Sequence, residues 1–88
     1  MTVIFLEGFE KETSKINNKK LALSVQSVIT SIESATHLAS VPNVKKLKGH
    51  KTAYRIRIGN YRIGFYYLNG VATLAAFGDR KDIYRKFP

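Results

Sequence analysis

Residues 54–68 read YRIRIGNYRIGFYYL, two runs of alternating aliphatic, aromatic and basic residues on either side of Gly59-Asn60. Alternation with a period of two is typical of β-strands. A glycine and an asparagine between two such runs predict a two-residue hairpin turn, because this turn needs positive φ angles that both residues tolerate. The stretch therefore predicts an antiparallel hairpin with strands at Tyr54–Ile58 and Tyr61–Leu68.

The two faces of this hairpin differ in chemistry. One face is apolar, and the other carries Arg55, Arg57, Arg62, Gly64 and Tyr66. The register sets Arg57 opposite Arg62, although like charges across a strand pair are destabilising by roughly a few tenths of a kcal/mol. An anion between the two guanidinium groups would replace this repulsion with charge-assisted hydrogen bonds. We therefore predict a phosphate site here, the alternative being a solvated face whose arginines splay apart.

A second turn at Asn69-Gly70 predicts a third strand, Val71–Phe77, which completes an antiparallel meander. Its expected register sets Phe77 beside Arg62, Ala75 beside Gly64 and Thr73 beside Tyr66. Glycine and alanine at the centre of the polar face would leave room there for an anion.

The remaining segments predict helices and one more strand. Thr2 to Leu6 is β-branched and aromatic, which favours a strand. Apolar residues at helical spacing predict two antiparallel helices, from Phe9 to about Asn17 and over 21–35, packed on the apolar sheet face. Residues 38–50 favour an irregular basic connection. The tail, residues 79–88, is expected to form one helical turn over the sheet edge or to remain extended.

Composition bounds the class of protein. The 88 residues, 44% of them hydrophobic, predict one α+β domain over 1–88. Without cysteine there is no disulfide or thiolate metal site, and His37 and His50 are too few for a zinc site, so we expect no metal and no cofactor. No stretch approaches the roughly 18 apolar residues of a membrane span, and no signal peptide is evident. We expect a cytoplasmic protein.

The charge is distributed unevenly. The formal net charge is +9, and residues 1–44 are neutral overall, so the whole excess lies in 45–88. A one-sided positive field attracts polyanions, most often nucleic acid and less often an anionic membrane or an acidic protein. A basic surface that only maintains solubility is the alternative.

Basic and aromatic residues also flank the predicted sheet. We expect the chain entering the first hairpin strand and the chain leaving the last strand to meet at one edge and form a groove, where bases stack while phosphates pair. His50 could act there as an acid or base, and Tyr84 has the alternative of ordinary packing. The candidate RNA-binding residues are Lys45, Lys46, Lys48, His50, Lys51, Tyr66, Lys81, Arg85 and Lys86.

The chain resembles the RelE/ParE superfamily of bacterial and archaeal toxins. The resemblance spans the whole chain and rests on LKG at 47–49, YRIRIGNYRI at 54–63 and FGDRKDIYR at 77–85. For RelE-type members it implies metal-free cleavage of messenger RNA in the ribosomal decoding site. It also implies neutralisation by a cognate antitoxin, which we expect to lay an acidic segment over the sheet or to displace the C-terminal tail.

The resemblance also implies roles for individual residues. By position, Arg55 and Arg57 match a basic pair that many RelE-like toxins hold as lysines, Arg62 matches a phosphate-binding arginine, and Arg80 and Tyr84 match a C-terminal arginine and tyrosine. We take these five as the candidate catalytic residues. Because a guanidinium group hardly ever releases its proton, Arg55 and Arg57 are poor general bases. His50, Lys51 or Tyr84 would then assist, or the rate would rest on electrostatics and orientation.

Two other functions fit the sequence. A ParE-like inhibitor of DNA gyrase would use the same hairpin to bind its target without RNA chemistry. A non-enzymatic RNA-binding relative would bind RNA with a steep salt dependence and never cut it. The pairing of Arg80 with Tyr84 favours the ribosome-dependent endoribonuclease.

Overall fold

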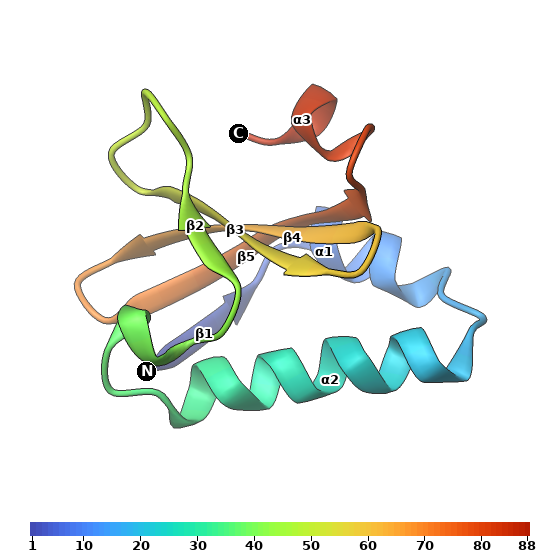
Figure 1. Ribbon diagram of the computed structural model, residues 1–88, viewed down its shortest axis with the longest axis horizontal. Coiled ribbons are helices and arrows are strands. Elements are labelled where there is room, and N and C mark those ends of the chain that lie inside the picture. The colour runs from blue at the N-terminus through green and yellow to red at the C-terminus, as the bar shows by residue number, and fades with distance from the viewer.

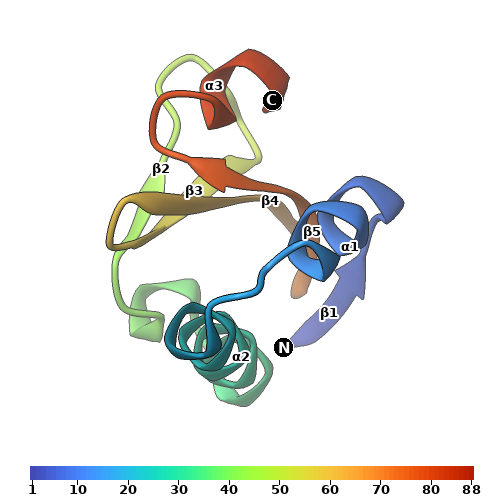
Figure 2. The same cartoon turned by 90° about the vertical axis from the view of Figure 1, so that its right-hand side faces the viewer.

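The computed structural model describes residues 1–88 and is built around a five-stranded mixed sheet. Along the chain lie β1 (Thr2–Phe5), α1 (Glu7–Ser14), α2 (Lys19–Ser34), a 3-10 turn (Leu38–Ser40), β2 (Val44–Lys46), β3 (Ala53–Ile58), β4 (Tyr61–Leu68), β5 (Val71–Asp79) and α3 (Ile83–Lys86). The strand order is β1-β5-β4-β3-β2. Figures 1 and 2 show α2 beneath this sheet and α3 above it.

The predicted hairpin is confirmed. β3 and β4 pair antiparallel, with Arg57 opposite Arg62 and Arg55 opposite Gly64. Gly59 has a φ of 58° in the first turn, and Asn69 and Gly70 have φ angles of 49° and 77° in the second. These left-handed conformations explain the residues at Gly59, Asn69 and Gly70. Asn60 does not have the positive φ expected for it.

The sheet is larger than the predicted three-strand meander. Residues expected to be an irregular connection include β2, which pairs antiparallel with β3 and sets Lys45 beside Arg55. Three residues, two of them lysines, are too few to show an alternating pattern, so this strand was missed. β1 joins the opposite side of the sheet and pairs parallel with β5, which makes the sheet mixed.

The predicted register between β4 and β5 is correct only at its start. Thr73 lies beside Tyr66 as expected, but a β-bulge near Gly64 and Phe65 shifts the later pairs. Arg62 therefore lies beside Gly78 and Gly64 beside Ala76, rather than beside Phe77 and Ala75. The bulge adds one residue to β5, which turns both Leu74 and Phe77 to the core although their odd spacing would place them on opposite faces.

The main core lies between the sheet and the first two helices. α2 begins at Lys19, and the Asn18 side chain accepts a hydrogen bond of 2.9 Å from the Leu21 backbone N–H, a typical N-cap contact. α1 begins two residues earlier than predicted and lies beside β5. Both helices face the same core, which contains Phe9, Val25, Ile32, Ile56, Ile63, Phe65, Leu74 and Phe77.

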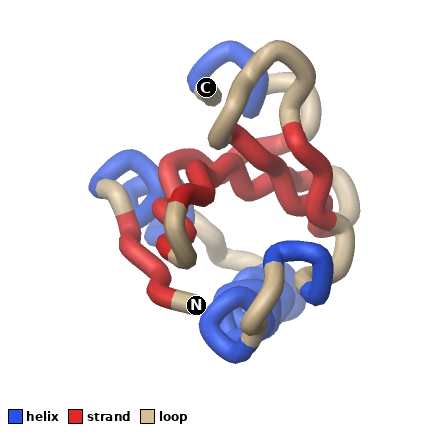
Figure 3. Tube along the Cα trace, turned by 90° about the vertical axis from the view of Figure 1, so that its left-hand side faces the viewer, coloured by secondary structure: helices blue, strands red, loops and turns tan.

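The C-terminal tail forms a second, smaller cluster on the other face. Figure 3 shows α3 on the far side of the strands from α2. Ile83 and Phe87 are buried there against Ala53 and Ala76. The helical turn is confirmed, but it lies over the sheet face and not over its edge, so only α1 and α2 share the face predicted for the helices. None of the helices has the length and apolar character needed to cross a membrane.

Candidate anion-binding site

Three arginines meet at one corner of the sheet, around the Gly59-Asn60 turn. Arg57 and Arg62 face each other on the two strands that the turn joins. Arg80 follows β5, and its backbone N–H donates a hydrogen bond of 2.8 Å to the Asn60 carbonyl. We call these three residues the arginine corner. The prediction of an Arg57/Arg62 pair is confirmed, and the backbone contact at Asn60 places Arg80 next to it.

The Arg62 guanidinium is anchored to the turn. Its Nη1 donates hydrogen bonds of 2.9 Å to the carbonyls of Gly59 and Tyr61. A guanidinium carries five N–H donors, so the Nε and Nη2 edge keeps three of them for a ligand. That edge matches the fork in which arginine binds phosphate oxygens. No carboxylate forms an ion pair with Arg57, Arg62 or Arg80.

Arg55 lies one pair further along the hairpin. Its Nη1 donates a hydrogen bond of 3.3 Å to the carbonyl of Asn43, which has a φ of 63°. The same carbonyl accepts a bond of 3.3 Å from the Arg57 backbone N–H. With Lys45, these residues surround a shallow pocket of about 300 Å³ beside the arginine corner. Asn43 was not among the predicted site residues, because a backbone carbonyl leaves no signal in a sequence.

The room expected above Gly64 does not exist. The Phe87 ring lies directly over Gly64, and a Cβ atom built on this glycine would clash with it. Tyr66, expected to line a groove, packs against the same ring with centroids 5.1 Å apart. The candidate anion site is therefore limited to the arginine corner. Gly64 instead allows the tail to approach the sheet closely.

The two ends of the expected groove do not meet at one sheet edge. β3 and β5 run in the same direction because each is antiparallel to β4, so Lys51 and Arg80 lie at opposite ends of the strands. The tail folds back over the sheet, and Leu47 packs against the cluster that contains Phe87. The β2 strand and the β2–β3 loop hold the exposed candidates Lys45, Lys46, Lys48, His50 and Lys51.

Tyr84 stands apart from the arginines. Tyr84 is 51% exposed on α3, and its hydroxyl forms no hydrogen bond within the chain. α3 covers the sheet face that carries the arginines, and Tyr84 follows Arg80 by four residues. No contact joins its ring to a guanidinium group in this structure, so the five candidate catalytic residues are only partly gathered.

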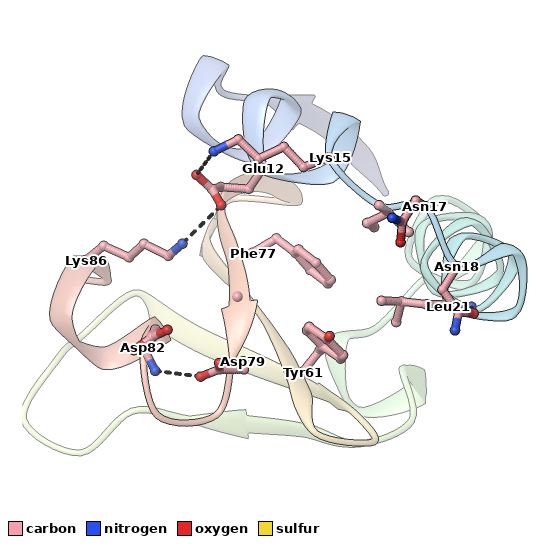
Figure 4. Close-up of a pocket in the computed structure, with 12 residues that line it drawn as sticks. Glu12, Lys15, Asn17, Asn18, Leu21, Tyr61, Phe77, Asp79, Asp82 and Lys86 are labelled. Atoms are coloured by element: carbon pink, nitrogen blue, oxygen red, sulfur yellow. Dashed lines mark hydrogen bonds and ion pairs between the residues drawn. The ribbon is translucent and has the colours of Figure 1, made fainter.

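A polar cleft near the arginine corner anchors the tail (Figure 4). It is lined by three of the six acidic residues of the chain, Glu12, Asp79 and Asp82. The Lys86 ammonium lies 3.5 Å from the Glu12 carboxylate. Lys81, by contrast, is exposed and forms no ion pair, and Arg85 reaches Asp82 at 3.8 Å. The sequence did not indicate this cleft, because its residues come from distant segments.

The carboxylates of Asp79 and Glu12 both favour their charged form. The backbone N–H groups of Asp82 and Lys81 donate to Asp79 at 2.8 and 2.9 Å and lower its pKa. The ammonium groups of Lys86 and Lys15 lower the pKa of Glu12. Because the folded pKa is the lower one in each case, the stabilisation is present above the unfolded pKa and is lost as pH falls through the folded value.

We therefore expect the tail to loosen only in acid, below about pH 4, and to be unaffected between about pH 5 and pH 8. The amide resonances of Lys81 and Asp82 in an NMR titration measure this directly. In Asp79→Asn the acid-induced shift of the Lys81 amide should become much smaller. A shift that persists unchanged in this variant would show that Asp79 does not hold the turn.

Comparisons with known proteins place these features in a family. No family model matches the chain. Toxin RelE3 of Methanocaldococcus jannaschii is 30% identical over 89 aligned positions that cover 100% of both chains. The RelB-RelE antitoxin-toxin complex from Methanococcus jannaschii contains a chain with a TM-score of 0.81 and 28% identity, covering 97% of this chain and 99% of that one.

More distant structures share the fold. The isolated E. coli RelE toxin has a TM-score of 0.67 at 21% identity, covering 97% of this chain and 92% of its own. These likenesses define the class as a small α+β toxin fold. The full-length identity to Toxin RelE3 is more specific, and this chain belongs to the RelE family of toxins of type II toxin-antitoxin systems.

Proposed function

We propose that this toxin is a ribosome-dependent endoribonuclease that cleaves messenger RNA in the decoding site without a metal. The observation that supports this most strongly is the arginine corner, because three arginines that form no ion pair with a carboxylate flank one turn. Phosphates are the ligands that such groups bind best. The RelE family membership connects this site to a toxin.

In the proposed reaction, the 2′-oxygen of one nucleotide attacks the adjacent phosphorus. The bond from phosphorus to the 5′-oxygen of the next nucleotide breaks, which leaves a 2′,3′-cyclic phosphate and a 5′-hydroxyl. A base takes the proton of the 2′-hydroxyl, and an acid protonates the departing oxygen. Arg57 and Arg62 would stabilise the charge that accumulates on the non-bridging oxygens, and Arg55 and Arg80 would hold neighbouring phosphates.

The distribution of residues favours Tyr84 over His50 and Lys51 for proton transfer. His50 and Lys51 precede β3, and within that strand the four residue steps from Ala53 to Arg57 already span about 13 Å. Tyr84 lies on the tail that begins at Arg80, above the same sheet face. Its exposed hydroxyl is free to approach a bound nucleotide, and the ribosome would supply orientation.

We also propose that a cognate antitoxin neutralises the toxin. RelB accompanies RelE in the complexes from Methanococcus jannaschii and Pyrococcus horikoshii. For a chain with a net charge of +9, an acidic segment is the complementary partner. The exposed lysines of β2 and the β2–β3 loop, together with the arginine corner, are the groups that such a segment would pair with.

Purified toxin, ribosomes and a defined messenger RNA test the activity. We expect cleavage inside the decoding site that requires ribosomes. The cleavage should persist when the toxin has been treated with EDTA before the assay. A parallel assay measures supercoiling by DNA gyrase. Intact messenger RNA together with inhibited supercoiling would contradict the proposal and support the gyrase-poison alternative. Binding to RNA without cleavage would support an inactive relative.

A further inference from the structure

A second surface adjoins the arginine corner, in the groove between α2 and the β3–β4 turn. The groove has a volume of about 790 Å³. In Figure 1 the turn projects above the N-terminal half of α2. Lys20, Ser24 and Ser27 line the groove from α2, while Asn43, Arg57 and Asn60 line it from the sheet side. None of the residues around the groove is acidic.

The polar groups of this groove suit an anion. Lys20 and Arg57 contribute two positive charges without an ion-pair partner. Ser24 and Ser27 lie three residues apart on one side of α2, and neither hydroxyl donates a hydrogen bond within the chain. Hydroxyl, amide and cationic groups are the side chains that commonly contact nucleic-acid phosphates. The apolar residues that line the groove are aliphatic, with Leu23 60% exposed, and the lining offers no aromatic ring for a base to stack on.

Arg57 connects the groove to the arginine corner. It faces Arg62 across the hairpin and also lines the groove together with Lys20, so the arginine corner and the groove share this residue. We propose that this groove binds the phosphate backbone of RNA next to the scissile nucleotide. The inference rests on the proposed function and adds a subsite to it. The backbone belongs either to the messenger RNA or to the ribosomal RNA.

The affinity for uncleavable 2′-O-methyl RNA tests whether the groove binds RNA. A trinucleotide is short enough to occupy the arginine corner alone, whereas a dodecanucleotide also reaches the groove. We expect Lys20→Ala to weaken dodecanucleotide binding by about 3- to 10-fold and to reduce the salt slope by about 0.7, the value for one lost phosphate contact. Ser27→Glu adds a negative charge and should weaken it further. Trinucleotide binding should not change.

Two variants on the same helix serve as controls. Lys19→Ala removes the same charge and Thr30→Glu adds the same charge, but neither residue lines the groove. Both should bind each RNA like the wild type. Cosedimentation with ribosomes that carry no messenger RNA distinguishes a groove that binds ribosomal RNA from one that binds messenger RNA. Weaker sedimentation of Lys20→Ala assigns the groove to ribosomal RNA, and unchanged sedimentation with weaker dodecanucleotide binding assigns it to messenger RNA.

The subsite would be overturned if Lys20→Ala and Ser27→Glu both bind the dodecanucleotide and ribosomes with wild-type affinity and salt slope. Weaker binding by Arg62→Ala in the same assays would leave the proposed function standing. If these groove variants lose affinity only for poly-glutamate, the groove serves an acidic protein and the inference is wrong. If the wild type binds neither RNA nor ribosomes, the proposed function fails and the subsite fails with it.

Discussion

The Arg62→Ala variant is expected to cleave messenger RNA about 100- to 1,000-fold more slowly than the wild type, the usual cost of removing one preorganised donor from a developing negative charge. Arg62 is preorganised because its Nη1 is held by the Gly59 and Tyr61 carbonyls. Arg62 forms no ion pair with a carboxylate. The cleavage rate in single-turnover assays with excess toxin measures the loss, and growth inhibition should disappear in parallel.

Two further variants separate chemistry from folding. Losing the exposed contacts of Arg62 to its turn should lower the free energy of unfolding by only about 1 kcal/mol, which urea denaturation measures. Arg62→Lys keeps the charge but not the fork, so it should restore only part of the rate. Lys11→Ala changes an exposed lysine on α1 and should leave cleavage unchanged. A fully active Arg62→Ala toxin would remove Arg62 from the site.

Phe87→Ala is expected to lower the free energy of unfolding by about 3 kcal/mol, because truncating a buried phenylalanine leaves a cavity. Phe87 is 2% exposed and lies between Gly64, Tyr66 and Ile83. For a chain of this length, the loss corresponds to a melting temperature lower by about 12 °C or more. Thermal and urea denaturation measure both quantities.

Tyr84→Ala is the matched comparison for stability. It removes an aromatic ring from the same tail, but this ring is half-exposed, so the change should stay within about 0.5 kcal/mol. If Phe87→Ala unfolds like the wild type, the tail is not docked on the sheet in solution. The space above Gly64 would then be open, as the alternation of the strands first suggested.

The hairpin was predictable because its signals are local. The Gly59-Asn60 turn fixes the register, and the register fixes which side chains share a face, so the Arg57/Arg62 pair follows from the sequence. The apolar face of α2 was predictable for the same reason, because its residues recur at helical spacing. The bulge in β5 was not, because it depends on Leu74 and Phe77 both reaching a core formed by other segments.

The surroundings of the site required the structure. That the tail docks over Gly64 depends on Phe87, which lies 23 positions further along the chain. The anchoring of Arg62 and Arg55 uses backbone carbonyls, to which any residue type contributes equally. The ion pair between Lys86 and Glu12 joins opposite ends of the sequence. Composition and spacing report none of these contacts.

The most direct test is a structure of this toxin on a ribosome whose messenger RNA carries a 2′-deoxy nucleotide before the scissile phosphate. The missing hydroxyl prevents cleavage and traps the bound state. We predict that the scissile phosphate lies within hydrogen-bonding distance of the guanidinium groups of both Arg57 and Arg62. A scissile phosphate bound elsewhere, with both arginines in solvent, would contradict the account.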